Sequence, residues 1–213
     1  MAVAAVVAVV TGAVGGSANG LLVSLGKIPP FIATLGTMVI FRSLTLYFAD
    51  SGLVSTENEA FRSFGGSVFC RIPLPGGLLL NRTRLGRHIC AVGSNERVAR
   101  YSGIRTGVVK YATYLIAGLT AGISALLFGS RLNAVSSTSA GLSYELDAIA
   151  AVIIGGSSMN GGKASVWGTL AGVLILGIVS NVLDMWGISV TLQGTVKGLV
   201  IIIAVMIQRK TTA

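Results

Sequence analysis

Charged side chains are scarce in this sequence of 213 residues. Asp, Glu, Lys and Arg make up 11% of the chain, whereas a soluble domain carries about a quarter. Histidine occurs once, as His88, and the two cysteines, Cys70 and Cys90, lack the spacing of a metal site. One histidine cannot supply a Ser/His/acid or Cys/His catalytic arrangement, and the few carboxylates form no proton relay. We therefore expect no catalytic residue, no bound metal and no cofactor.

A phosphate-binding loop is also lacking, although residues 156–163 are rich in glycine and end in Lys163. The motif requires glycine where Ser157 stands, and Ser or Thr where Ala164 stands. We interpret this segment as a tight turn between two helices. Hydrolysis of ATP is therefore expected in a separate subunit.

The chain is instead rich in apolar residues, which make up 53% of it and give a mean hydropathy of +0.81. This composition predicts an all-α integral membrane protein, a polytopic bundle forming a single domain over residues 1–213. The net charge of +9 does not indicate a nucleic-acid partner, because the basic residues cluster beside apolar segments and no aromatic-basic surface accompanies them.

We predict about six helical segments in the membrane, surrounded by lipid. They are residues 1–25, 31–49, 108–130, 146–158, 164–183 and 190–207. The fourth is expected to be short or broken, because thirteen residues make a helix of about 20 Å, less than the bilayer core of roughly 30 Å. Glycines four residues apart predict close helix packing. These glycines are at positions 12/16/20, 118/122, 168/172 and 194/198.

The segment from Asn81 to Lys110 holds seven of the sixteen basic residues and separates apolar segments, so we place it in the cytoplasm. Asn95 fits an N-cap, Glu96 a first turn, Arg100 a last turn, and Gly103 the left-handed residue that closes a helix. This pattern predicts a short helix over residues 96–101. By position and charge alone, a solvated loop that only sets topology is the favoured interpretation.

Five stretches resemble the permease subunits of ribose-type ABC importers and run in that family's order. They are KIPPFIATLG (27–36), TRLGR (83–87), AVGSNE (91–96), ARYSGI (99–104) and YELDAIAAVIIGG (144–156). The chain departs from the family at Arg97 and Val98, where small residues are usual. The resemblance implies that residues 81–107 form a cytoplasmic loop that couples the permease to an ATPase. The residues it assigns to coupling are Arg84, Gly86, Arg87, Gly93, Asn95, Glu96, Arg100 and Gly103.

The resemblance also implies partners and a location. A second permease subunit would pair with this chain as a homodimer or heterodimer, a cytoplasmic ABC ATPase would dock on the loop, and an extracytoplasmic sugar-binding protein would deliver a ribose-like pentose or hexose. The location would be the bacterial inner membrane. The alternatives are a branched-chain amino acid permease, which shares the architecture, and a truncated membrane fragment that does not transport.

Three charged residues are candidates for the substrate path. Glu145 and Asp147 are favoured as first-turn acids of a helix capped by Ser143, but they could instead offer hydrogen-bond acceptors to a sugar. Lys197 lies in the middle of a predicted span, where an ammonium facing lipid is costly. We expect it to face the interior of the bundle, with a partner that the sequence does not identify.

One crossing of the membrane has no predicted helix. The orientation places Asp50 outside and Asn81 inside, yet the best uncharged run between them is residues 72–80, nine residues that include Pro73 and Pro75. A helical crossing needs about 20 apolar residues. We therefore expect an incomplete permease, short at its N-terminus and lacking an internal span, which inserts poorly and does not transport alone.

Overall fold

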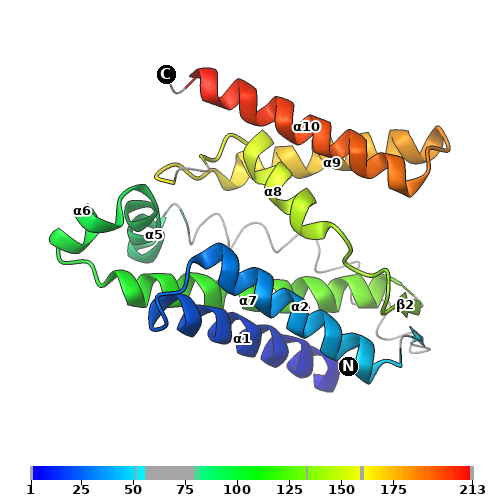
Figure 1. Ribbon diagram of the computed structural model, residues 1–213, viewed down its shortest axis with the longest axis horizontal. Coiled ribbons are helices and arrows are strands. Elements are labelled where there is room, and N and C mark those ends of the chain that lie inside the picture. The colour runs from blue at the N-terminus through cyan, green and yellow to red at the C-terminus, as the bar shows by residue number, and fades with distance from the viewer. Residues whose placement is uncertain are drawn as a thin grey trace. The chain divides into compact units, whose positions relative to one another are not determined.

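The computed structural model describes residues 2–50, 52–55, 80, 82–132, 134–158 and 161–211, and its secondary structure is almost entirely helical (Figure 1). The chain divides into two compact units. The first comprises Met1–Ile72 and Arg97–Ala140, and the second comprises Pro73–Glu96 and Gly141–Ala213. This confirms the all-α expectation, while the single domain stays a prediction.

The first unit is built on a pair of long helices that run in opposite directions. Its elements are α1 (Ala2–Ser24), α2 (Pro30–Phe48), β1 (Leu53–Ser55), most of α6 (Glu96–Tyr101), α7 (Thr106–Arg131) and β2 (Ala134–Ser136). Pro30 is the first residue of α2, where its missing N–H costs little. β1 pairs antiparallel with β2, with Val54 opposite Val135.

Glycines bring α1 and α7 into backbone contact, as their spacing predicts. A Cβ on Gly12 would lie 3.0 Å from the Cα of Gly122, and one on Gly16 would lie 3.0 Å from the Cα of Gly118. Gly20 is covered by Tyr111. Because no side chain separates the two backbones, the helices approach more closely than larger residues would allow.

The second unit consists of α5 (Arg84–Ser94), α8 (Tyr144–Ile154), α9 (Val166–Met185) and α10 (Val190–Thr211). Gly168 and Gly172 seat α9 on α8, as their spacing predicts. A Cβ on Gly172 would lie 3.1 Å from the backbone nitrogen of Gly155, and one on Gly168 would collide with the carbonyl of Gly155. Leu176 continues this contact into a small core with Ala150 and Ala151.

Three expectations about the second unit need correction. Residues 84–94 form helix α5 rather than a loop. Gly194 and Gly198 have no described atom within 4 Å of a built Cβ, so the predicted packing face on α10 is wrong for the part of the chain that the structure describes. Ser143 precedes α8, but its side chain makes no capping hydrogen bond because its backbone is left-handed, with φ of 65°.

The expected short helix is confirmed as α8, which has eleven residues, begins at Tyr144 and ends at Ile154. Its length of about 16 Å is well below the thickness of a bilayer core. The residues that follow, 155–158, leave the helix through Gly156, which has a φ of +80°.

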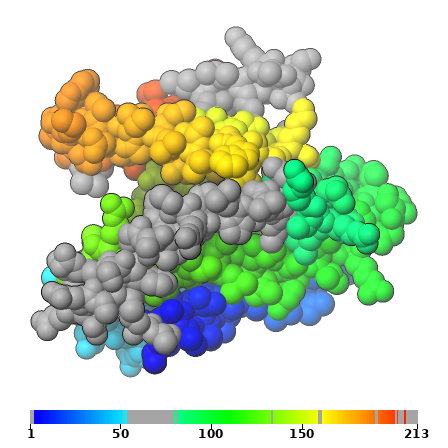
Figure 2. Space-filling view, turned by 180° about the vertical axis from the view of Figure 1, so that it is seen from behind, coloured from blue at the N-terminus to red at the C-terminus, as the bar shows by residue number. Residues whose placement is uncertain are grey.

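Four described helices are long and apolar enough to cross a membrane, namely α1, α2, α7 and α9. Their surfaces carry large apolar side chains that nothing in their own unit covers. On α9, which lies at the surface in yellow to orange in Figure 2, Leu174 is 61% exposed and Ile178 is 65% exposed. Lipid is the solvent that such faces require. The expected absence of a crossing between Asp50 and Asn81 concerns residues that lie mostly outside the described ranges.

Candidate functional site

Helix α5 starts at a side-chain cap that the sequence already contains. The hydroxyl oxygen of Thr83 accepts a hydrogen bond from the backbone N–H of Gly86 at 3.1 Å. This satisfies one of the free N–H groups of the first turn. Gly86 is buried, while Arg84 and Arg87 are exposed on the helix surface.

Helix α6 has the predicted residues 96–101, with Glu96 in its first turn and Arg100 in its last. Its end forms a Schellman motif, because the N–H of Ile104 donates to the carbonyl of Ala99 and the N–H of Gly103 donates to that of Arg100, both at 3.1 Å. Gly103 has a φ of +81°, which confirms it as the left-handed residue. The motif gives this short helix a fixed end.

The exposed side of α6 carries an apolar pair. Val98 is 58% exposed and Tyr101 is 91% exposed. Residues three apart lie on one helix face, so the two side chains form a small apolar patch, and Arg97, which precedes Val98 in the chain, is exposed as well. On the opposite side, Ala99 is buried. An exposed aromatic residue with a neighbouring arginine is the composition found at the centre of protein interfaces.

The end of α5 lies against the turn between α8 and α9. A Cβ built on Gly161 would lie 3.1 Å from the Cα of Gly93 and would collide with its carbonyl, while one on Gly162 would lie 3.2 Å from the Cβ of Ser94. Gly161 and Gly162 both have a φ of +82°, a conformation that side chains rarely adopt. Only glycine satisfies both the backbone conformation and the close approach at Gly161.

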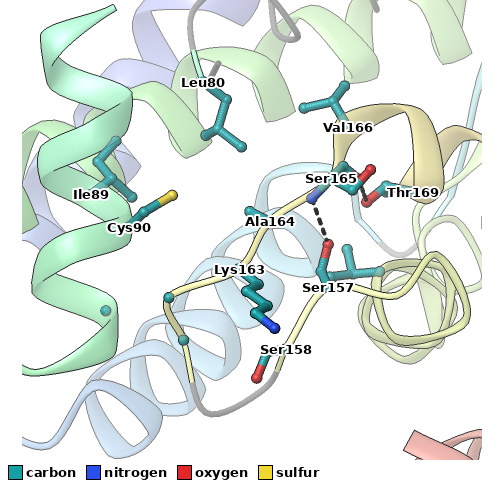
Figure 3. Close-up of a pocket in the computed structure, with 14 residues that line it drawn as sticks. Leu80, Ile89, Cys90, Ser157, Ser158, Lys163, Ala164, Ser165, Val166 and Thr169 are labelled. Atoms are coloured by element: carbon teal, nitrogen blue, oxygen red, sulfur yellow. Dashed lines mark hydrogen bonds between the residues drawn. The ribbon is translucent and has the colours of Figure 1, made fainter. Parts of the chain in front are cut away.

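A pocket of about 340 Å³ lies beside this contact, within the second unit. Figure 3 shows Ile89 and Cys90 of α5 on one side and the connection from Ser157 to Val166 on the other. The backbone N–H of Ser165 donates to the hydroxyl of Ser157 at 3.1 Å, and the hydroxyl of Ser165 accepts from the N–H of Gly168 at 3.0 Å. These two bonds fix the connection where α9 begins.

The second unit also contains an ion pair between α8 and α10. Nζ of Lys197 lies 2.8 Å from Oδ2 of Asp147, and the two side chains are 23% and 31% exposed. Lys197 therefore has the partner that its position inside a predicted span requires. Glu145, two residues before Asp147 on α8, is exposed. The pair neutralises charges that would otherwise be costly in a low-dielectric setting.

A buried glutamine near the start of α10 holds the first turns of this helix in place, before Lys197. Nε2 of Gln193, one turn earlier on α10, donates to Oδ1 of Asp184 at 2.7 Å and to the carbonyl of Ile188 at 3.0 Å. Asp184 lies in the last turn of α9, and Ile188 lies in the connection between α9 and α10. These bonds fix the start of α10 and so the register at which Lys197 meets Asp147.

The structure brings Asp147 and Lys197 together but leaves Glu145 outside their contact. The contact of Gly93 with Gly161 was missed by sequence reasoning. Two glycines at 161 and 162 indicated a turn, but no pattern in the sequence pointed to α5 as its neighbour. The apolar pair on α6 was also not predicted, although its member Val98 was recognised as a departure from the small residues that are usual in the family.

The chain matches the protein family described as the permease component of a branched-chain amino acid transport system, over residues 77–205. It is 44% identical over 207 residues to the ribose import permease protein of Bacillus subtilis, covering 92% of this chain and 64% of that protein. It is 39% identical over 222 residues to the ribose import permease protein of Escherichia coli, covering 98% of this chain and 69% of that protein.

A third relative is the L-arabinose transport system permease protein of Escherichia coli, which is 34% identical over 201 residues, covering 90% of this chain and 61% of the relative. The chain thus spans slightly less than two thirds of the Bacillus and arabinose relatives. No solved structure matches it with comparable significance.

Proposed function

Because the chain belongs to the family of ribose-type ABC importer permeases, we propose that it is the membrane-spanning subunit of an ATP-driven importer for a simple sugar. The curated relatives named for ribose and L-arabinose support a sugar over an amino acid. The four described helices that are long and apolar enough to cross a membrane support a multi-pass location, in this proposal the bacterial inner membrane.

The proposed importer divides its work among several chains. ATP hydrolysis takes place in a cytoplasmic ABC ATPase, and an extracytoplasmic binding protein delivers the sugar. A second permease subunit, identical or related, completes the path through the membrane. This division is supported by the family to which the chain belongs.

We assign docking of the ATPase to residues 81–107. The observation that carries the proposal is the pair of short helices in this basic segment. Helix α5 begins at the cap formed by Thr83, and α6 ends in a Schellman motif. Within α6, the exposed side chains of Val98 and Tyr101 supply apolar area for a partner groove, and the cation of Arg97 supplies charge.

The proposed sugar path passes α8. Glu145 offers an exposed carboxylate whose oxygens accept hydrogen bonds from sugar hydroxyls. Asp147 and Lys197 contribute as a neutral pair, which presents both acceptors and donors to a sugar without attracting a charged solute. This combination suits a polar, uncharged substrate.

Reconstitution tests the proposal. The chain is co-expressed with its ATPase and binding protein, incorporated into vesicles, and assayed for ATP-dependent uptake of labelled ribose, L-arabinose and D-allose, with leucine as the comparison. We expect uptake of a sugar and none of leucine. Uptake of leucine would favour the branched-chain amino acid alternative, and a complete lack of uptake with an associated ATPase would favour the non-transporting fragment.

A further inference from the structure

The seat of α5 on the turn between α8 and α9 is made of backbone rather than of side chains. Gly161 meets the carbonyl and the Cα of Gly93, and Gly162 meets the Cβ of Ser94. A contact between long side chains can absorb a displacement by changing rotamers, whereas a contact between backbones has no such freedom. A displacement of this end of α5 is therefore transmitted directly to the turn between α8 and α9.

The turn is joined to α8 and α9 by contacts of the same kind. Gly168 and Gly172 place the backbone of α9 on Gly155 and Ala151 of α8. At its other end α8 carries Asp147, which holds Lys197 of α10. A continuous set of contacts thus runs from Gly93 to Lys197 within the second unit.

We infer that Gly161 and Gly162 are positioning residues that make α5, α8 and α9 move as one body, so that a shift of α5 reaches the Asp147–Lys197 pair. The inference rests on the proposed docking of an ATPase at residues 81–107. It identifies the contacts through which a movement of the docked segment displaces residues of the proposed sugar path. Helices α8 and α9 transmit the shift because a close-packed backbone interface moves as a unit rather than deforming.

The first test compares two glycines that share a strained backbone but differ in their neighbours. Gly161 and Gly156 have φ values of +82° and +80°, so alanine is strained at both. Only at Gly161 would the added Cβ meet α5, because no described atom lies within 4 Å of one at Gly156. The matched variants are Gly161→Ala and Gly156→Ala, reconstituted with the ATPase and binding protein.

The readout is the stimulation of ATP hydrolysis by the sugar-loaded binding protein, alongside thermal stability and ATPase association. We expect Gly161→Ala to lose about tenfold of the stimulation, within the range of typical coupling between sites, while Gly156→Ala keeps it. Full stimulation of ATP hydrolysis in both variants would overturn the inference. Equal loss in both would also overturn it, because the effect would then come from backbone strain.

A second test fixes the contact covalently. Cys70 and Cys90 are replaced by serine, and cysteines are introduced as Ser94→Cys with Gly162→Cys, whose Cβ atoms would lie 3.2 Å apart, close to the range of disulfides. Uptake by the oxidised protein is compared with uptake by the same protein after reduction, so that strain at position 162 is common to both. We expect the same uptake in both states. Failure of the bond to form, or uptake that returns only on reduction, would overturn the inference.

Stimulation measured with the unchanged chain distinguishes a failure of the proposed function from a failure of the positioning role. If it shows no stimulation by any sugar-loaded binding protein, the proposed function fails. If it shows stimulation and Gly161→Ala shows as much, the proposed function stands and the positioning role of the glycine turn is wrong.

Discussion

Several glycines in this protein matter because the lack of a side chain lets another backbone approach closely. On α9, Gly172 faces the carbonyl of Ala151, whereas no described atom lies within 4 Å of a Cβ at Gly177 on the same helix. The two positions have the same residue in the same kind of element, but they differ in what a larger side chain would meet.

We therefore predict opposite outcomes for leucine at these two positions. Gly172→Leu forces α8 and α9 apart and should lower stability by about 1–3 kcal/mol, the usual cost of overpacking. Gly177→Leu should leave stability unchanged, and Gly194→Leu should behave like it. A thermal-shift series in detergent measures all three, and equal losses at 172 and 177 would contradict this account.

The ion pair of Asp147 and Lys197 leads to a second prediction about single residues. Either residue changed to alanine leaves a partly buried charge without its partner, at a cost of about 1.5–3 kcal/mol. The exchanged variant Asp147→Lys with Lys197→Asp restores opposite charges and should recover part of the loss. Thermal unfolding of Asp147→Lys, Lys197→Asp and the exchanged variant gives the coupling, because the two single variants carry the same substitutions as the double one. Additive losses in the exchanged variant would show that the pair does not act as a unit.

Among the elements, α6 was predicted correctly because its start and stop signals are local. Glu96, Arg100 and Gly103 lie within eight residues, and each acts on the helix next to it. Helix α5 was missed because its density of basic residues suggested a loop, although Thr83 with the apolar positions Leu85 and Ile89 offered a cap and a face.

Long-range partners could not be predicted in the same way. Spacing shows which residues share a helix face, but it does not show what that face meets. Gly168 and Gly194 have the same spacing to a second glycine, and only the first packs on another helix among the described residues. The partner of Lys197 lies 50 residues away in the chain, beyond any local signal.

The Schellman end of α6 supports a prediction for this element. Gly103→Val places a branched side chain at a φ of +81°, so the end of α6 should loosen and ATPase co-purification should fall. The double change Glu96→Ala with Arg100→Ala should also weaken it, while membrane insertion stays intact. Gly187→Val, at a φ of +70° with no described atom nearby, is the matched control. Undiminished ATPase association in both α6 variants would count against coupling at this helix.

At the scale of the whole molecule, the first unit constrains the topology. α2 and α7 each continue into one strand of the β1–β2 pair, so the two helices end on the same side. Val98 precedes the start of α7. Gly52 lies near the other end of α7, where the carbonyl of Gly52 accepts a hydrogen bond from the hydroxyl of Ser137. If α7 crosses the membrane, these two residues are on opposite faces.

Cysteine labelling from each side tests this prediction. Gly52→Cys and Val98→Cys, each in a background without Cys70 and Cys90, should react with an impermeant reagent from opposite sides. Labelling of both from one side would support the hypothesis of a missing crossing between Asp50 and Asn81. It would also contradict a crossing of the membrane by α7, because Gly52 lies at the far end of that helix from Val98.

The contact of α1 with α7 has a consequence for the time course of synthesis. Ser17 and Tyr111, which are hydrogen-bonded, are separated by 94 residues in the chain. At about 5–20 residues per second, α1 waits roughly 5–20 seconds before its partner is made. The α8–α9 contact, by contrast, closes between neighbouring helices as soon as the second one emerges. α1 contains no charged residue, so lipid can hold it during that interval until α7 arrives and displaces the lipid from its glycine face.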